Sequence, residues 1–188
     1  MLEEKLEKLK NGIFTRGEML QLRDSASKLA QKGNVIAQAI VDIIHNKELP
    51  SHEVAYLFMG FCPGATFRNR KDEYWIEEGI CKFDFLKDYS QMKKFTTVLK
   101  GDFVILKKNK EFGRTMELFG HGRVLEVCRR KADELTYLRV DWSDQKQILE
   151  VPAMGCTKTV NIRPFEKVKA RMHPDFWRWL GSNDPTGR

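Results

Sequence analysis

The chain has 188 residues, of which 41% are hydrophobic and 31% are charged, as expected for one domain or for a small domain with an appendage. This composition excludes an intrinsically disordered chain, and no apolar run approaches the roughly 20 residues that a membrane-spanning helix needs. The formal net charge is +7. Because residues 1–50 are nearly neutral, the excess lies later in the chain, as in proteins that bind polyanions such as nucleic acid.

The sequence shows no signal for targeting, metal binding or catalysis. The N-terminus, MLEEKLEKLK, is acid-rich and has no apolar core of the signal-peptide type, so we expect a cytoplasmic protein that does not contact a membrane. Four cysteines and four histidines are scattered without the spacing of a zinc site, which predicts neither a metal nor a cofactor. No phosphate-binding loop or hydrolase motif occurs, so we do not expect an enzyme.

Helical periodicity runs through the first 48 residues. Thr15 and Glu18 have the spacing of a capping box, and Gly33 separates two runs in which apolar residues recur every three or four positions. This stripe predicts a packed helix face. Two short helices around a glycine also suggest a helix-turn-helix, but the region lacks the cations that a DNA-reading helix needs. We assign residues 1–50 to a helical N-terminal segment.

Segments of strand character follow Pro50. The first, HEVAYLFMG, leads into a loop, a short helix and a second loop. Because the later segments leave little room for crossover helices, we expect an α+β fold with a small curved β-barrel over residues 51–181, in which His121 lies in a turn. Pro174 suits the first turn of a short C-terminal helix, and residues 182–188 are expected to form a disordered tail. The later strand segments are LKGDFVILKKN, RTMELFGHGRVLEVCRR, LTYLRVDW, KQILEVP and KTVNIRP.

A set of motifs in this second part occurs in a fixed order. The set consists of YWIEEGI at 74–80, LKGDFVILKK at 99–108, FGHGRVLEV at 119–127, LRVDW at 138–142 and KTVNI at 158–162. In this order the motifs resemble the EVE-like domain that precedes the motor in some McrB-type restriction ATPases, a member of the PUA and YTH-like group of small barrels. The resemblance covers about residues 54–164. The loop FCPGATFRNRKDE departs from the family, because it is more basic and lacks a tryptophan–glycine cluster.

The resemblance implies a module that takes one nucleic-acid base out of its helix into a pocket walled by aromatic rings. A flipped base loses stacking and pairing worth a few kcal/mol, and stacking on aromatic side chains can recover that loss. Each ring could instead be a core residue, because large rings in small barrels are usually buried. The residues expected to form the pocket are Phe61, Phe67 and Trp75 as walls, Trp142 as its closure, and Cys62 and Asp72 at the edge of the base.

Binding of phosphates requires cations beside such a pocket, and basic residues are clustered at four places. The first group follows the aromatic loop, the second precedes a strand, and the third occupies an expected hairpin. The last of these, Arg129, Arg130 and Lys131, is more typical of a solvated surface, because Asp133 and Glu134 partly neutralise it. If several of them contact phosphate, salt must weaken the binding steeply, whereas a solvated basic surface is the alternative for each. The expected phosphate contacts are Arg68, Arg70 and Lys71, then Lys93 and Lys94, then Lys107, Lys108, Lys110 and Arg114.

Together these expectations describe a DNA-binding specificity module that reads a modified base within a restriction or defence system, with an ATPase or nuclease as a further partner. An RNA-binding domain of the same fold is one alternative, which the ribose 2′-OH would distinguish. The other alternative is a protein-interaction domain in which residues 1–48 drive oligomerisation.

Overall fold

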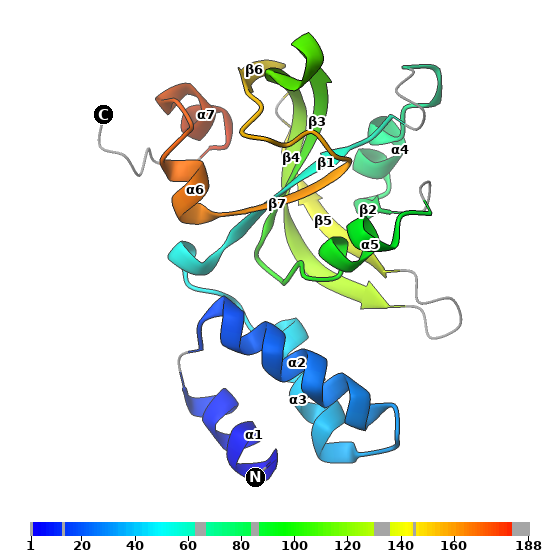
Figure 1. The fold of residues 1–188 in the computed structure, drawn as a ribbon, viewed down its shortest axis with the longest axis vertical. Helices are drawn as coiled ribbons and strands as arrows, with labels where there is room; N and C mark the ends of the chain where they lie inside the picture. The colour runs from blue at the N-terminus through cyan, green and yellow to red at the C-terminus, as the bar shows by residue number, and fades with distance from the viewer. Residues whose placement is uncertain are drawn as a thin grey trace. The chain divides into compact units, whose positions relative to one another are not determined.

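The chain divides into two compact units, Met1–Glu53 and Val54–Arg188, close to the boundary expected after residue 50 (Figure 1). The computed structural model describes residues 2–12, 14–62, 67–83, 87–129, 136–144 and 146–181. No helix within these ranges is both long enough and apolar enough to cross a bilayer. The expected disordered tail at 182–188 lies outside the described residues.

The first unit consists of helices, as the sequence predicts. Thr15 Oγ1 accepts a hydrogen bond from the Glu18 amide at 3.3 Å, and the Glu18 carboxylate accepts one from the Thr15 amide at 2.9 Å, which confirms the capping box. Gly33 has a φ of 85° in the turn between two helices, a conformation that glycine adopts without steric cost. The helices are α1 (Leu2–Asn11), α2 (Arg16–Ala30) and α3 (Val35–Asn46). The predicted apolar stripe is buried at Met19, Leu22 and Ala26 on α2 and at Ile40 and Ile44 on α3, whereas its members Leu29 and Val35 are exposed.

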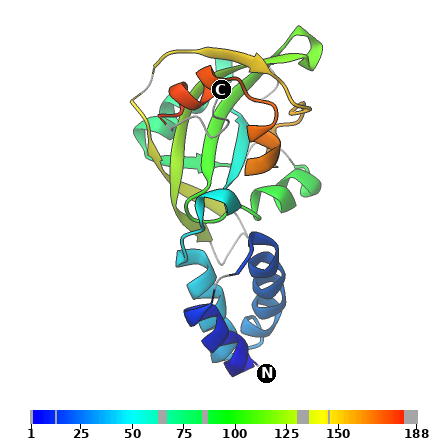
Figure 2. The same ribbon diagram turned by 90° about the vertical axis from the view of Figure 1, so that its left-hand side faces the viewer.

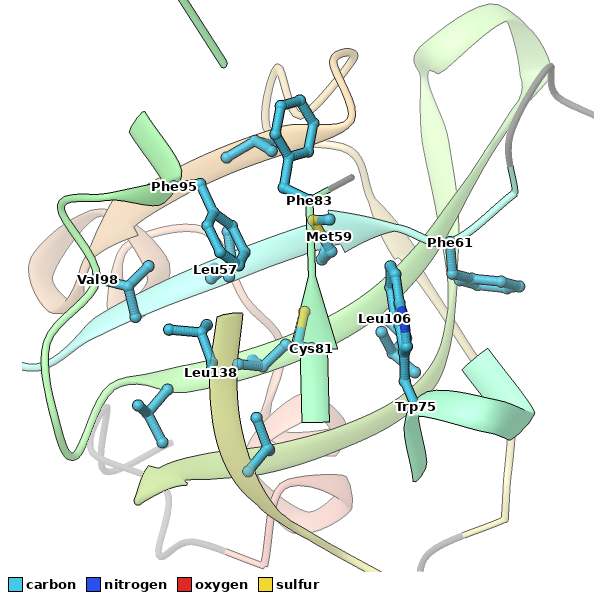
Figure 3. Packing of buried hydrophobic residues seen from close by; sticks show 14 of the residues in the cluster. Leu57, Met59, Phe61, Trp75, Cys81, Phe83, Phe95, Val98, Leu106 and Leu138 are labelled. Carbon is cyan, nitrogen blue, oxygen red and sulfur yellow. The ribbon is translucent and has the colours of Figure 1, made fainter. Parts of the chain in front are cut away.

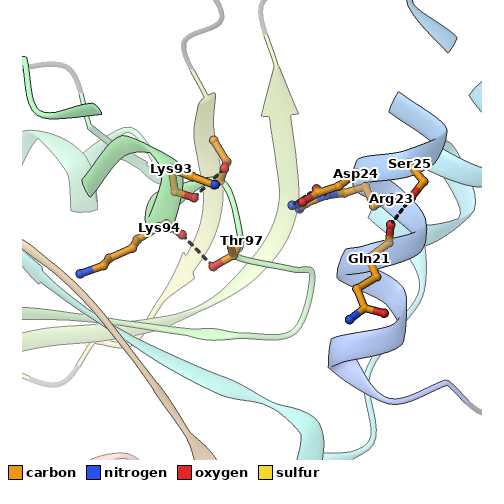
Figure 4. A network of polar contacts seen from close by, with 8 residues as sticks. Gln21, Arg23, Asp24, Ser25, Lys93, Lys94 and Thr97 are labelled. Atoms are coloured by element: carbon orange, nitrogen blue, oxygen red, sulfur yellow. Dashed lines mark hydrogen bonds and ion pairs between the residues drawn. The ribbon is translucent and has the colours of Figure 1, made fainter. Parts of the chain in front are cut away.

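Hydroxyl groups satisfy backbone carbonyls locally in both units (Figure 4). In α2, Ser25 Oγ donates to the Gln21 carbonyl at 2.9 Å. In the second unit, Thr97 Oγ1 donates to the Lys94 carbonyl at 2.8 Å, just after α5 (Tyr89–Phe95) ends. Each bond closes a single helical turn, so these contacts stabilise helix geometry and do not by themselves form a site.

The second unit is built on a mixed sheet of seven described strands in the order β2-β5-β4-β3-β1-β7, with β6 paired to one end of β4. Strands β1 and β3 are parallel, and the other pairs are antiparallel. The strand path does not close on itself, so the expected mixed α+β class is confirmed, whereas a closed barrel is not what these strands form. The strands are β1 (Ala55–Gly60), β2 (Ile80–Lys82), β3 (Phe103–Lys110), β4 (Thr115–Arg129), β5 (Thr136–Trp142), β6 (Leu149–Pro152) and β7 (Val160–Pro164).

Helices cover both faces of this sheet. In Figure 1, α4 (Asp72–Glu77) and α5 lie on one side of the strands, and α6 (Phe165–Lys169) and α7 (Pro174–Trp179) lie on the other; Figure 2 shows α7 in front of the second face. Alternate residues of β1 therefore enter different cores. Leu57 and Met59 pack in the first core, and Tyr56 and Phe58 in the second. Because both of its faces are covered, β1 is apolar at nearly every position.

The long strand β4 contains the GHG motif, which the sequence analysis placed in a turn. That prediction is wrong, because His121 lies within the strand and is buried edge-on against the Trp179 ring, with centroids 4.5 Å apart. The glycines serve strand packing instead. A Cβ on Gly122 would lie 2.5 Å from the Asp141 carbonyl oxygen of β5, so only glycine permits the observed approach of the two strands.

The edge strand β7 is held by a side chain. The Val160 amide donates to Gln91 Oε1 of α5 at 2.9 Å, and Gln91 Nε2 donates to the Asp88 carboxylate at 2.7 Å. Asp88 also caps α5, since its side chain accepts from the Ser90 and Gln91 amides. Neither α5 nor α6 was predicted from the sequence, whereas the predicted C-terminal helix with Pro174 in its first turn is confirmed as α7.

Candidate nucleic-acid interface

The two rings expected as the principal pocket walls lie in the first core. Phe61 is 0% exposed and Trp75 is 1% exposed. Trp75 projects from α4 toward the strands, among Leu106 and Cys81 (Figure 3), and the Phe61 ring meets Phe119 edge-on with centroids 5.0 Å apart. The expectation that these rings present open faces to a ligand is therefore corrected. The short helix α4 needs a bulky side chain to fill the space above the sheet, and Trp75 fills it.

The other residues expected to form the pocket make structural contacts in the same part of the first core. The Trp142 indole Nε1 donates to the Trp75 carbonyl at 2.9 Å, so this half-buried ring fastens β5 to α4. The Asp72 carboxylate, expected at the edge of a base, is buried and accepts from Arg70 Nε at 2.8 Å. Cys62 is half-buried, and this burial raises the pKa of its thiol. The side chain of Phe67 lies outside the described residues.

The Arg70 guanidinium has more partners within the protein than the side chain of a typical surface arginine has. Its guanidinium lies 5.8 Å from the centroid of the Phe61 ring and 5.9 Å from that of Phe119. Its hydrogen bond with Asp72 raises the pKa of the guanidinium, and a second carboxylate, Glu73, lies 3.6 Å away. Arg70 therefore covers an aromatic corner of the core and neutralises a buried acid.

Lys107 and Lys110, both expected as phosphate contacts on the β3 hairpin, have partners within the protein. Lys107 is only 3% exposed, and its Nζ donates to Asn109 Oδ1 at 2.9 Å and to the Cys156 carbonyl at 2.6 Å. The prediction that Lys107 contacts phosphate is thus corrected, because strand alternation turns it toward the second core. Burial lowers the pKa of its amine to about 8. Lys110 is paired with Glu117 at 3.2 Å and with Glu150 at 3.0 Å.

Four other predicted cations meet at the end of β1, and we call them the β1-end cluster. Arg68 and Lys71 are exposed on the segment before α4, where the Lys71 amide donates to the Phe61 carbonyl at 2.9 Å. Arg70 lies over the Phe61 ring, and Lys108 follows Lys107, which is opposite Gly60 in the β1–β3 register, so both cations lie near the end of β1. No ion pair with a described carboxylate is seen for Arg68 or Lys71. The cluster consists of Arg68, Arg70, Lys71 and Lys108.

The other predicted phosphate contacts lie on other elements. Lys93 and Lys94 are exposed on α5, which packs against β7. Arg114 is exposed at the turn between β3 and β4. The predicted cations therefore do not form the groups that their positions in the sequence suggest.

An aromatic residue that the sequence analysis did not choose is exposed beside the β1-end cluster. Tyr74, the neighbour of Trp75 on α4, is 48% exposed. Lys82 Nζ of β2 lies 5.9 Å from the centroid of the Tyr74 ring and 5.9 Å from that of Tyr137 on β5. Helical spacing could have found it, because Lys71 and Tyr74 are three residues apart on the outer side of the helix, as Asp72 and Trp75 are on the inner side.

A cavity of about 390 Å³ lies elsewhere, between β6 and α7. Its lining includes Trp179, whose Nε1 donates to the Gln147 carbonyl at 2.6 Å, and the exposed ion pair of Arg178 with Asp175. None of the predicted site residues lines it. Among the described residues, no group of three or more histidines, cysteines or carboxylates is arranged to hold a metal ion.

Comparison with known proteins yields no relative. No protein-family model matches the chain, and neither a curated protein nor a solved structure matches it. The resemblance to EVE-like domains therefore depends on the order of its motifs alone.

Proposed function

We propose that the chain is a DNA-binding module that contacts the phosphate backbone through the β1-end cluster. The observation that supports this proposal is the meeting of cations from two separate segments, the loop before α4 and strand β3, at one end of β1. Arg68 and Lys71 extend into solvent there, so they can approach phosphate oxygens without breaking an ion pair described in the structure.

The four cations contribute unequally to this interface. Arg70 is already compensated by Asp72 and Glu73, so it adds less attraction for a phosphate than an uncompensated arginine would. Arg68 and Lys71 carry most of the expected contact. Each phosphate contact releases condensed counterions from DNA, so each contributes about 0.9 to the slope of log affinity against log salt concentration.

A double substitution, Arg68→Ala with Lys71→Ala, tests the proposal. We expect roughly tenfold weaker binding to a short fluorescein-labelled duplex, and a salt slope between about 50 and 200 mM that is smaller by about two. Fluorescence anisotropy measures both quantities. The matched control is Lys28→Ala with Lys32→Ala, which removes the same charge from exposed positions of the first unit. An equal loss in the control, or no salt-dependent binding by the natural sequence, would refute the proposal.

The proposal extends to recognition of a modified base within a restriction or defence system, with an ATPase or nuclease as the partner that acts on the bound DNA. This part is supported only by the ordered motifs between residues 74 and 162. Because Phe61 and Trp75 are buried, reading a base between them would require the aromatic corner beneath Arg70 to open. Duplexes that differ only in one methylated or hydroxymethylated base test it, and equal affinities would leave only general DNA binding. An RNA of the same sequence in competition would identify the RNA-binding alternative.

A further inference from the structure

We propose that Tyr74, Lys82 and Tyr137 form a stacking site for an unpaired base, so that the nucleic acid preferred by this surface is single-stranded or locally unpaired. The inference depends on the proposed function and specifies its substrate. Three elements supply the site: α4 provides Tyr74, β2 provides Lys82 and β5 provides Tyr137.

The exposure of Tyr74 is the first argument. Almost half of this side chain faces solvent, although it is large and apolar and its neighbour Trp75 is fully buried. A base can stack only on a ring face that is open, and every base offers a π face, so stacking on an exposed tyrosine is tolerant of sequence. An intact duplex does not offer base faces along its length, which is why the site favours unpaired nucleotides.

The geometry around Lys82 is the second argument. Lys82 and Tyr137 are directly opposite in the β2–β5 register, and the ammonium group lies 5.9 Å from the centroids of both tyrosine rings. The ammonium group lies over one face of each ring, so a base would stack on the other face of Tyr74, with the cation near enough to attract that nucleotide's phosphate. Tyr137 also lies directly opposite Cys128 in the β4–β5 register, so its backbone position is fixed by strands on both sides.

The charges along α4 indicate toward which end of the helix the bound nucleic-acid backbone extends. Lys71 precedes Tyr74 by one helical turn and is exposed, and the exposed Glu73 at this end is paired with Arg70, whereas Glu77 and Glu78 are exposed at the other end of the helix. The carboxylates repel phosphates, so the backbone leaves the tyrosine toward Lys71 and the β1-end cluster. The stacking site is thereby continuous with the phosphate contacts proposed above.

The test compares Tyr74→Ala with Tyr89→Ala, which removes an even more exposed tyrosine from α5, where the ring is 75% exposed. The probes are a fluorescein-labelled oligothymidine and a duplex of equal length. We expect Tyr74→Ala to weaken binding of the single strand about tenfold and binding of the duplex less than about twofold. Tyr89→Ala should change neither, and Tyr74→Phe should keep the single-strand affinity because it keeps the ring.

The outcomes separate this inference from the proposed function. If the duplex is bound in a manner that depends on Arg68 and Lys71 but Tyr74→Ala and Tyr89→Ala behave alike on the single strand, the stacking site is refuted and the phosphate interface stands. Equal losses on both probes in Tyr74→Ala also refute it. If neither nucleic acid is bound, both proposals fail.

Discussion

Lys107 is a charged side chain placed by strand alternation into an apolar core. Val104 and Leu106 face the first core, so the next side chain faces the second, where the Cys156 carbonyl and Asn109 Oδ1 accept hydrogen bonds from its ammonium group. Burial disfavours the charged form and lowers its pKa to about 8, compared with about 10.5 in an exposed lysine. Such a group links folding to pH.

Between these two pKa values the unfolded chain binds more protons than the folded one. The contribution of Lys107 to the free energy of unfolding therefore increases as the pH rises. Below about pH 8 both states are protonated, and the penalty of burying the charge is complete. We expect the free energy of unfolding of the natural sequence, relative to Lys107→Met, to rise by about 1 kcal/mol per pH unit between pH 8 and pH 10.

Urea denaturation of both proteins across that range measures this slope. The difference between the two proteins is the required quantity, since the thiols of Cys62 and Cys128 have raised pKa values and act in the opposite direction in both. The Cys156 thiol also has a raised pKa, but it interacts with Lys107, so part of its effect belongs to the measured difference. The Tyr56 phenol, whose pKa is raised to about 12, acts only above pH 10. A difference that does not vary with pH would contradict the buried-lysine interpretation.

At the scale of elements, the sequence predicts the helices and strands that are determined by residues close together in the chain. The capping box of α2 involves two residues three positions apart, and the strand β1 is a continuous apolar run, so both could be recognised. The helices α5 and α6 could not, because they are short and polar and are held by distant contacts such as Gln91 with the Val160 amide. Similarly, which ring of the Tyr74–Trp75 pair points inward depends on how α4 packs, which periodicity over six residues barely determines.

The backbones of β4 and β5 approach each other closely at Gly122, and a substitution can test how much stability depends on this approach. An alanine Cβ at Gly122 would lie 2.5 Å from the Asp141 carbonyl oxygen and 2.6 Å from Val140 Cγ1, so Gly122→Ala must push β5 away from β4. We expect a loss of about 2–3 kcal/mol in the free energy of unfolding. The matched control is Gly120→Ala in the same strand, where the nearest atom, Ile76 Cδ1, lies at an ordinary 3.5 Å. Thermal denaturation of both variants checks this, and equal losses would contradict it.

At the scale of the whole molecule, the two units have separate roles in the proposed function. Every residue assigned to the phosphate and stacking sites belongs to Val54–Arg188, which has its own two cores. We expect a fragment of residues 54–188 to bind single-stranded DNA within about threefold of the whole chain, since the first unit is nearly neutral and adds little electrostatic attraction. Anisotropy titration at one salt concentration tests this, provided that the fragment melts cooperatively. A loss of tenfold or more would assign binding residues to the first unit.

The order of strands in the sheet bears on how the protein is made. Strand β1 is among the first parts of its unit to leave the ribosome, yet its neighbours on either side are β3 and β7, and β7 ends at Pro164. Until that last segment emerges, a nascent chain carries a strand that is apolar on both faces and has one unsatisfied edge. We expect chaperones to bind such an exposed segment during synthesis. A chain truncated before residue 160 would be prone to self-association through the unpaired edge of β1.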